Sequence, residues 1–203
     1  MSLWAIVPTK PLRRGKSRLA DILSEEDRYR LNRNMLVNTL TAINISQRID
    51  EILVVSRDTE ALSLARNYGA RTIHEEGEPQ LITAIQRGIV VAKSLGARSV
   101  FILPADLALL HPDDIRLFLN HRQKPPEMIL ALDRHQDGTN AIFLNPPVIL
   151  PIYLGSDTFL KHQAWAEANQ VRFEVCSLLR FSLDIDEPDD LDILRLLEEQ
   201  PLG

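Results

Sequence analysis

Three aspartates stand where carboxylates could bind a divalent cation. Asp106 ends the most apolar run of the sequence, FILPAD, and Asp184 and Asp186 lie two residues apart in FSLDID. If FSLDID is a strand, the latter two side chains point to one face and repel each other unless a cation or a proton lies between them. Carboxylate oxygens suit Mg²⁺. We therefore predict a metal site at Asp106, Asp184 and Asp186, with the capping of a following turn or helix as the alternative for Asp106 and Asp186.

A loop rich in cations supplies the opposite charge, although the chain has a formal net charge of -5. The segment VPTKPLRRGKSRLAD follows the apolar run LWAIV and contains Lys10, Arg13, Arg14, Lys16 and Arg18. Lysine offers phosphate a compact point charge, and arginine offers it a two-pronged fork. The GKS in this loop is no Walker motif, because Lys10 stands where that motif needs glycine. We predict phosphate binding by Lys10, Lys16 and Arg18, with a solvated charge run as the alternative.

Two further segments carry groups that could hold a second anion. DGTNA contains Thr139 and Asn140, and YLGSDTFLKH contains Gly155 and then Thr158 in the first turn of a predicted helix. The free N–H groups of a helix N-terminus attract anions. Asp-Gly is also a common hairpin turn, so DGTN alone fits architecture as well as chemistry.

These side chains must be positioned by an alternation of strands and helices. Several short apolar runs lack polar alternation, as strands buried on both faces do. We predict strands at 3–7, 51–56, 71–75, 99–106, 128–133, 140–144, 172–177 and 181–186. Segments of helical period lie from Ser24 through Leu40, from Asp58 to Gly69, at 81–94, and near 112–120, 157–169 and 188–199.

This order predicts a single α/β domain over residues 1–203, with a mainly parallel, doubly wound sheet and helices on both faces. The segment DRHQDGTNAIF is typical of a hairpin and is expected to add an antiparallel edge. In open α/β sheets, ligands bind at the carboxyl ends of the strands. The basic loop and Asp106 both follow strands, so both lie where a ligand is expected.

Composition argues against several classes of protein. Charged residues make up 25% of the chain and hydrophobic residues 45%, as in ordinary globular proteins, and the mild acidity gives no attraction to nucleic acid or anionic lipid. We expect neither a membrane span nor a secretion signal. The single cysteine, Cys176, argues against a disulfide framework and fits the cytoplasm. The lack of G-x-G-x-x-G removes the main support for a dinucleotide-binding dehydrogenase.

Together these residues describe a site for a nucleoside triphosphate, a divalent cation and a second anion. In nucleotidyl transfer, the attacking group can be a phosphate that is already ionised at neutral pH, so no strong general base is required. The five histidines show no triad or metal-ligand spacing, which agrees with such chemistry. Catalysis would depend on in-line positioning and on neutralising the charge of the phosphates, with Lys16 and Asp106 as the central residues.

The quoted segments, in this order and at these intervals, resemble the 2-phospho-L-lactate guanylyltransferase family of coenzyme F-420 biosynthesis, over nearly the whole chain. The resemblance implies a nucleotidyltransferase fold related to the molybdenum-cofactor guanylyltransferases and the GT-A glycosyltransferases. It also implies Mg²⁺-dependent transfer of GMP from GTP to a three-carbon phospho-acid, with release of pyrophosphate. The acid is 2-phospho-L-lactate, phosphoenolpyruvate or 3-phosphoglycerate.

The same resemblance assigns roles to single residues. The family's metal-binding carboxylates fall on Asp106, Asp184 and Asp186, and its signature lysines fall on Lys10 and Lys16. Its residues that contact the phospho-acid fall on Thr139, Gly155 and Thr158, the last of which is usually serine. The chain departs from the family at Ile82, where an amide that faces the nucleotide is usual, and at Ala108, where proline is usual.

Three alternatives use parts of the same pattern. A GT-A-like sugar transferase would use the same carboxylates and metal but would transfer a glycosyl group. A non-catalytic nucleotide-binding module would tolerate loss of the carboxylates, so the three aspartates together argue against it. A flavodoxin-like redox module would need a short Ser/Thr-rich phosphate cradle, which the first loop lacks. The base rate for soluble enzymes favours a homodimer.

Overall fold

The computed structural model describes residues 2–76, 80–148 and 158–199. Its strands are β1 (Leu3–Pro8), β2 (Glu51–Ser56), β3 (Arg71–His74), β4 (Ser99–Ile102), β5 (Glu127–Leu132), β6 (Thr139–Asn145) and β7 (Arg172–Val175). Its helices are the 3-10 helix η1 (Ser17–Leu19), α1 (Glu25–Ser46), α2 (Thr59–Asn67), α3 (Leu81–Ser94), α4 (Pro112–Asn120), α5 (Thr158–Ala168), α6 (Leu179–Ser182) and α7 (Pro188–Glu199). None of the described helices is long and apolar enough to cross a membrane.

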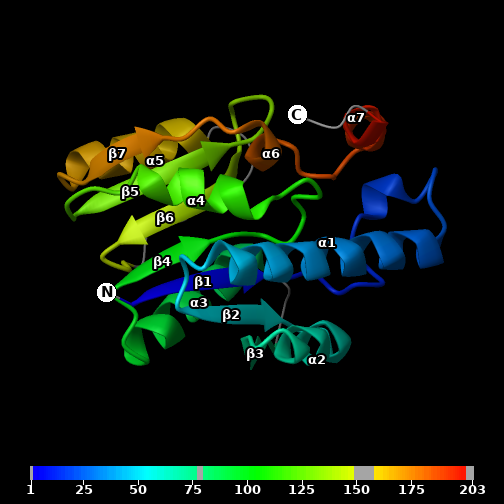
Figure 1. Cartoon of the computed structure of the whole chain (residues 1–203), viewed down its shortest axis with the longest axis horizontal. Helices are drawn as coiled ribbons and strands as arrows, with labels where there is room; N and C mark the ends of the chain where they lie inside the picture. Colours follow the sequence, from blue (N-terminus) through cyan, green and yellow to red (C-terminus); the bar gives the residue numbers. More distant parts are fainter. Residues whose placement is uncertain (1, 77–79, 149–157, 200–203) are drawn as a thin grey trace.

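The strands form one sheet of seven, in the order β3-β2-β1-β4-β6-β5-β7 (Figure 1). β1 pairs in parallel with β2 and β4, β2 with β3, and β5 with β7. β6 is antiparallel to both of its neighbours, β4 and β5. The predicted α/β fold with a mainly parallel sheet is therefore confirmed, and so is the hairpin. The antiparallel strand lies inside the sheet, however, and not at its edge.

The strand directions bring three loops to one end of the sheet. β1 and β4 are parallel and end there. β6 runs against β4 and begins at the same end, and β5 runs against β6 and therefore ends there too. The loop after β1, the loop after β4 and the turn between β5 and β6 thus meet at the carboxyl end of the central strands, where open α/β sheets bind ligands.

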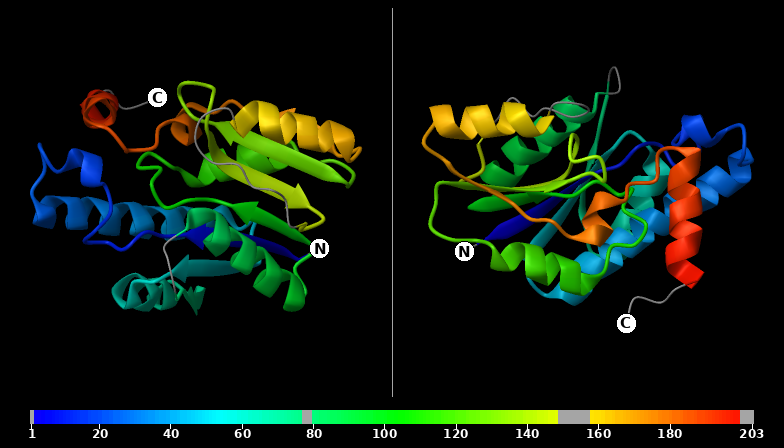
Figure 2. Two further views of the ribbon diagram at one scale, coloured as in Figure 1. Left: turned by 180° about the vertical axis from the view of Figure 1, so that it is seen from behind. Right: turned by 90° about the horizontal axis from the view of Figure 1, so that it is seen from above.

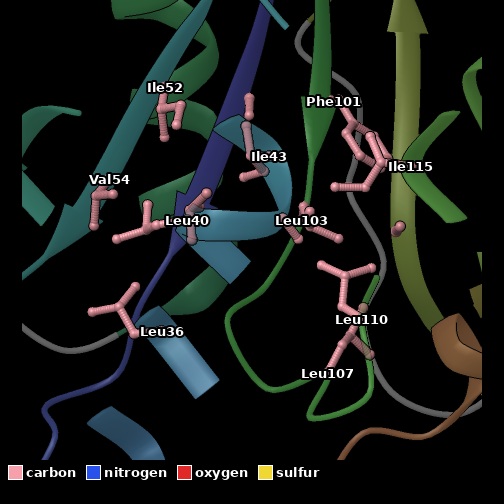
Figure 3. Packing of buried hydrophobic residues seen from close by; sticks show 14 of the residues in the cluster. Leu36, Leu40, Ile43, Ile52, Val54, Phe101, Leu103, Leu107, Leu110 and Ile115 are labelled. Carbon is pink, nitrogen blue, oxygen red and sulfur yellow. The ribbon is translucent and has the colours of Figure 1, made fainter. Parts of the chain in front are cut away.

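Helices cover both faces of the sheet (Figure 2). On one face α1, α2 and α4 bury a large apolar cluster, and Figure 3 shows side chains of α1 between β2 and the segment that follows β4. On the other face, Ile85 and Ile89 of α3 pack with Ile6 of β1, and Trp165 of α5 lies against the same cluster. Each fully buried side chain of this size contributes roughly 1.5–3 kcal/mol. This two-sided core fixes the strands whose ends carry the polar loops.

The strand predicted at 181–186 is wrong. Residues Leu179–Ser182 form the short helix α6 instead. The carbonyls of Phe181 and Ser182 accept from the Asn140 amide at 3.0 and 3.4 Å, and the Ile185 N–H donates to the Asp106 carbonyl at 3.2 Å. Groups that a strand would use for pairing are therefore bound to a side chain of β6 and to the loop after β4. The strand predicted at 99–106 also ends earlier, at Ile102.

We predict that Gly88→Ala lowers stability. Gly88 is a buried residue of α3, and a Cβ atom there would lie 2.6 Å from Cγ2 of Ile6 in β1. Alanine gains about 1 kcal/mol of helix propensity, but forcing a methyl group into a packed core costs about 1–3 kcal/mol. Denaturant unfolding should therefore show a net loss of about 1 kcal/mol. Val90→Ala, at an exposed position of the same helix, is the control. Equal stability of Gly88→Ala and the parent protein would contradict the close packing.

Candidate active site

The loop after β1 is held in a fixed path by two helices. The Asn32 side chain of α1 donates to the Leu12 carbonyl at 2.7 Å, and the Asp58 carboxylate before α2 accepts from the Leu12 N–H at 2.7 Å. At Gly15 a Cβ atom would lie 2.7 Å from Nδ2 of Asn32, so a larger residue would disturb this contact. Lys16 then takes the left-handed conformation, with φ 57°. The loop thereby turns the Lys16 side chain into the protein.

The ammonium group of Lys16 lies between two of the predicted carboxylates. Its Nζ is 2.7 Å from Oδ1 of Asp186 and 3.3 Å from Oδ2 of Asp106. The Lys16 side chain is only 3% exposed. Burial by itself lowers the pKa of this ammonium, but the charges of Asp106 and Asp186 outweigh burial and raise the pKa. Lys16 therefore remains charged and neutralises part of the acidic cluster.

The two aspartates after α6 are in different electrostatic states. Burial raises the pKa of Asp184, the nearby charge of Asp106 raises it further, and a hydrogen bond from the Asn140 amide at 3.1 Å opposes this rise. Burial acts on Asp186 in the same direction, but the Lys16 ammonium outweighs it and lowers the pKa of Asp186. Asp186 is therefore an anion paired with Lys16, whereas the surroundings of Asp184 disfavour its ionised form.

The segment 183–186 brings both aspartates to the site although it is not a strand. Leu183 and Ile185 are buried, and the intervening Asp184 and the following Asp186 line a cavity. The alternation predicted for this segment is therefore confirmed. The Asp186 carboxylate binds Lys16, and the backbone N–H groups of Asp186 and Glu187 donate to the Asp190 carboxylate at 2.9 and 2.7 Å.

A cavity of about 310 Å³ gathers most of the predicted site residues. Its lining includes Lys10, Arg18, Asp106, Thr139, Asn140, Asp184 and Asp186. A second cavity of about 390 Å³ shares Lys10 and Leu81 with the first and is lined by Thr9, Arg14, Arg57, Glu75 and Gln80 among others. The two adjoining cavities leave room for a ligand larger than a single phosphate.

The remaining predicted residues have different surroundings. Arg18 is exposed and forms an ion pair with Glu187 at 3.6 Å. Thr158 is fully buried, and its hydroxyl group contacts the Thr139 hydroxyl at 3.0 Å and donates to the Asp137 carbonyl at 3.1 Å. It therefore supports Thr139 from behind. Gly155 lies outside the described residues, so its role stays a prediction.

The sequence matches the family described as "Guanylyl transferase CofC like" over residues 3–199. The chain belongs to this family. This confirms the predicted family and enzyme class, and it favours nucleotidyl transfer over the sugar transferase and the binding module. The homodimer and the cytoplasmic location stay predictions.

Similar proteins carry three different printed names. A phosphoenolpyruvate guanylyltransferase of Conexibacter woesei is 35% identical over 198 residues, which cover 97% of this chain and 89% of that protein. A 2-phospho-L-lactate guanylyltransferase of Methanocaldococcus vulcanius is 34% identical over 191 residues, which cover 92% and 81%. A 3-phospho-D-glycerate guanylyltransferase of Colwellia psychrerythraea is 31% identical over 193 residues, which cover 95% and 90%.

Solved structures show the same fold at low identity. A nucleotidyl transferase of Methanothermobacter thermautotroptrophicus superposes with a TM-score of 0.69 at 16% identity, covering 98% of this chain and 97% of that one. A cytidylyltransferase of Leptospira borgpetersenii gives a TM-score of 0.63 at 14% identity, with 100% and 89% covered. The fold of this CofC-like chain is therefore that of nucleotidyltransferases.

Sequence reasoning missed two residues of the site. Arg134 lines the first cavity from the turn between β5 and β6, and the buried Asp190 of α7 holds it in an ion pair of 3.0 Å. The sequence pattern predicts only a helix near 188–199 for the segment that holds Asp190, and a hairpin for the segment that holds Arg134. Asp190 is the third residue of α7, and an acid at that position often accepts a hydrogen bond from the backbone N–H of the N-cap residue. That position is the one sequence signal that could have singled out Asp190.

The acidic groups fit a metal ion that is shared with a bound ligand. Within the described part of the chain, no three His, Cys, Asp or Glu side chains form a metal cluster by themselves. Mg²⁺ commonly needs only one or two carboxylates, with phosphate oxygens and water as its other ligands. Asp106 and Asp184 can supply that number, because Lys16 contacts Asp186 at 2.7 Å but Asp106 only at 3.3 Å and has no contact with Asp184 among the ion pairs of the described residues. The predicted metal site of three carboxylates stays a prediction.

We predict that Asp184→Asn makes this CofC-like protein more stable at pH 7. The folded state raises the pKa of Asp184, so the charge of this residue opposes folding above its ordinary pKa of 3.8. Asparagine removes that charge and can still accept from Asn140. Thermal unfolding should give a higher Tm for the variant at pH 7, and the difference should shrink as the pH falls toward 4. The exposed Asp189→Asn is the control, and a lower Tm of Asp184→Asn at pH 7 would contradict the assignment.

Proposed function

We propose that this CofC-like guanylyl transferase transfers GMP from GTP to a three-carbon phospho-acid in a Mg²⁺-dependent step of coenzyme F-420 biosynthesis. The observation that carries the proposal is the contact of Lys16 with Asp106 and Asp186 at the carboxyl end of the central strands of a nucleotidyltransferase sheet. It places fixed charges of both signs beside a cavity that also holds Asp184 and Thr139.

The two adjoining cavities support binding of the nucleoside in one and of the acceptor in the other. Glu75 and Gln80 offer polar atoms for a base in the second cavity, and Thr139 lines the first cavity, where a small acid would bind. Lys10 borders both cavities. Its charge therefore lies where the phosphates of GTP would pass from one cavity to the other.

The proposed reaction is an in-line displacement at phosphorus. An oxygen of the acceptor phosphate attacks the α-phosphorus of GTP and forms a new P–O bond. The bond from the α-phosphorus to the bridging oxygen breaks, and pyrophosphate leaves with that electron pair. The attacking phosphate is already ionised at neutral pH, so the chain needs no general base.

The proposed roles of the site residues are to neutralise the charge of the phosphates and to hold one another in position. Lys10 and Arg18 are placed to neutralise the triphosphate, and Lys16 holds Asp106 and Asp186 in one orientation. Because Lys16, Asp106 and Asp186 are fixed before the ligand binds, they need little rearrangement during the reaction. Asp106 and Asp184 would hold Mg²⁺, which when bound supplies charge neutralisation at the phosphates.

The acceptor is one of the three acids named in the relatives. Relatives with all three names are between 31% and 35% identical to this chain, so identity does not separate them. The three acids share a phosphate and a carboxylate and differ at the carbon skeleton, and the choice among them depends on small differences in pocket shape.

We predict that the purified protein releases pyrophosphate from GTP when Mg²⁺ and one of the three acids are present. Each acid is added separately, and pyrophosphate is measured by a coupled assay. Asp106→Asn should lower kcat about 100-fold or more, because it removes a fixed charge at the reacting phosphates. The exposed Asp21→Asn should remain active.

Circular dichroism should show that Asp106→Asn is folded. The proposal fails if no acid supports pyrophosphate release by the wild type. The role of Asp106 fails if its folded variant turns over at the rate of the wild type.

We propose that Glu75, whose carboxylate also pairs with Arg87 at 3.7 Å, selects guanine. Its side chain is 14% exposed, it lines the second cavity, and its backbone N–H is fixed to the Ser56 carbonyl at 2.9 Å. A carboxylate only accepts hydrogen bonds, and guanine presents two neighbouring donors, its ring N–H and its amino group. Guanine selection therefore does not require the amide that Ile82 replaces.

We predict that Glu75→Gln weakens the preference for GTP over inosine triphosphate, which lacks the amino group. Loss of a charged acceptor should reduce the ratio of the two kcat/KM values about tenfold. Glu76→Gln, at the exposed neighbouring position, should leave that ratio unchanged. An unchanged ratio in Glu75→Gln would show that guanine is selected elsewhere.

A further inference from the structure

The turn between β5 and β6 places a second arginine in the acceptor cavity. Its backbone is held by Asp133, whose carboxylate accepts from the Asp137 N–H at 3.0 Å and whose N–H donates to the Gly138 carbonyl at 3.1 Å. A Cβ atom on Gly138 would lie 2.7 Å from the Asp133 carboxylate, so the turn is tightly closed. Arg134 therefore projects from a fixed backbone.

The carboxylate of Asp190 joins this arginine to the acidic cluster. Asp190 is 4% exposed, and its Oδ1 lies 3.0 Å from Nη2 of Arg134. Its Oδ2 accepts from the N–H groups of Asp186 and Glu187. One buried side chain thus fixes both the backbone of Asp186, the partner of Lys16, and the guanidinium of Arg134.

Two other cations that line or adjoin this cavity, Lys16 and Arg18, are engaged in ion pairs. Lys16 is neutralised by two carboxylates. Arg18 is exposed and pairs with Glu187. Arg134 is 28% exposed and forms an ion pair with one oxygen of Asp190, while a guanidinium carries five N–H donors. Arg134 therefore combines a fixed position with donors that remain available to a ligand.

The proposed acceptor has two anionic groups that need different partners. Its phosphate attacks GTP and must lie near Asp106 and Asp184. Its carboxylate takes no part in bond formation and needs a cation elsewhere in the same cavity. Arg134 lines that cavity from the hairpin side, together with Thr139, whereas Lys10 lines it from the loop after β1.

We propose that Arg134 binds the carboxylate of the phospho-acid and that Asp190 positions Arg134 for this contact. The inference rests on the proposed function. Arg134 is then a substrate-binding residue, and Asp190 is a positioning residue. A planar guanidinium can bind a carboxylate through two parallel hydrogen bonds, so lysine would be a poor replacement.

The first test compares Arg134→Gln and Arg134→Lys with the wild type, with whichever of the three acids supports turnover. Loss of hydrogen bonds to a charged group should raise KM for the acid about 10- to 100-fold in Arg134→Gln. KM for GTP should stay within about twofold, and Arg134→Lys should recover only part of the loss. Arg195→Gln is the matched control, since Arg195 also pairs with an aspartate of α7, at 3.2 Å, but does not line the cavity.

Glycerol 2-phosphate, which carries the phosphate without the carboxylate, identifies the group that Arg134 binds. The wild type should use it much less well than the acid, and Arg134→Gln should remove most of that difference. If Arg134→Gln weakens both acceptors equally, the arginine binds phosphate and the proposal is overturned.

Asp190→Asn tests the positioning role while keeping the hydrogen bonds at the N-terminus of α7. Asparagine keeps an oxygen for the N–H groups of Asp186 and Glu187 but loses the charge that holds Arg134. The variant should raise KM for the acid, and the double variant with Arg134→Gln should be no worse than Arg134→Gln alone. Additive effects of the two substitutions would overturn the positioning role.

Calorimetric binding of the same acids separates the two proposals. Wild-type turnover with an unchanged KM in Arg134→Gln overturns this inference alone. A second outcome is that the wild type releases no pyrophosphate but binds an acid, while Arg134→Gln does not bind that acid. The proposed function then fails, and the contact of Arg134 with the acid stands. A wild type that neither turns over nor binds any of the three acids overturns both.

Discussion

The buried ammonium of Lys16 is the constraint on which the rest of the site depends. A lysine side chain that is only 3% exposed loses its hydration, and it stays charged because Asp106 and Asp186 lie within 3.3 Å. Removing one partner of such a buried pair typically costs about 3–5 kcal/mol. The loop after β1, the loop after β4 and the segment after α6 are therefore bound to one another by charge, although they are far apart in the sequence.

That contact also explains why the first loop follows so unusual a path. Lys16 adopts a left-handed backbone, which is uncommon for a residue with a side chain, and Gly15 lies too close to Asn32 for a Cβ atom. The surrounding hydrogen bonds to Leu12 hold this path without help from a ligand. Ordering the site costs less free energy on phosphate binding when its charges are already oriented than when the site must first assemble.

The sequence allowed the sheet and most of the residues that gather at the candidate site to be predicted, because apolar runs mark buried strands and ligands bind where parallel strands end. It could not show that Lys16 binds carboxylates in the structure, since lysine suits phosphate and aspartate equally well. The segment at 181–186 looked like a strand, but its carbonyls are bound by Asn140, a contact across more than forty residues that no local pattern reveals. The pairing of Arg134 with Asp190 was hidden for the same reason.

The balance of charge in the cluster connects its stability with its chemistry. Asp106, Asp184 and Asp186 carry three negative charges when ionised, and Lys16 contributes one positive charge, so two negative charges remain. One divalent cation would match that remainder. Burial, and after it the charge of Asp106, raise the pKa of Asp184, the acid that does not pair with Lys16. The charge of Asp184 thus opposes folding, and a divalent cation bound beside it would offset that cost, as expected where a site is organised for a ligand at the expense of stability.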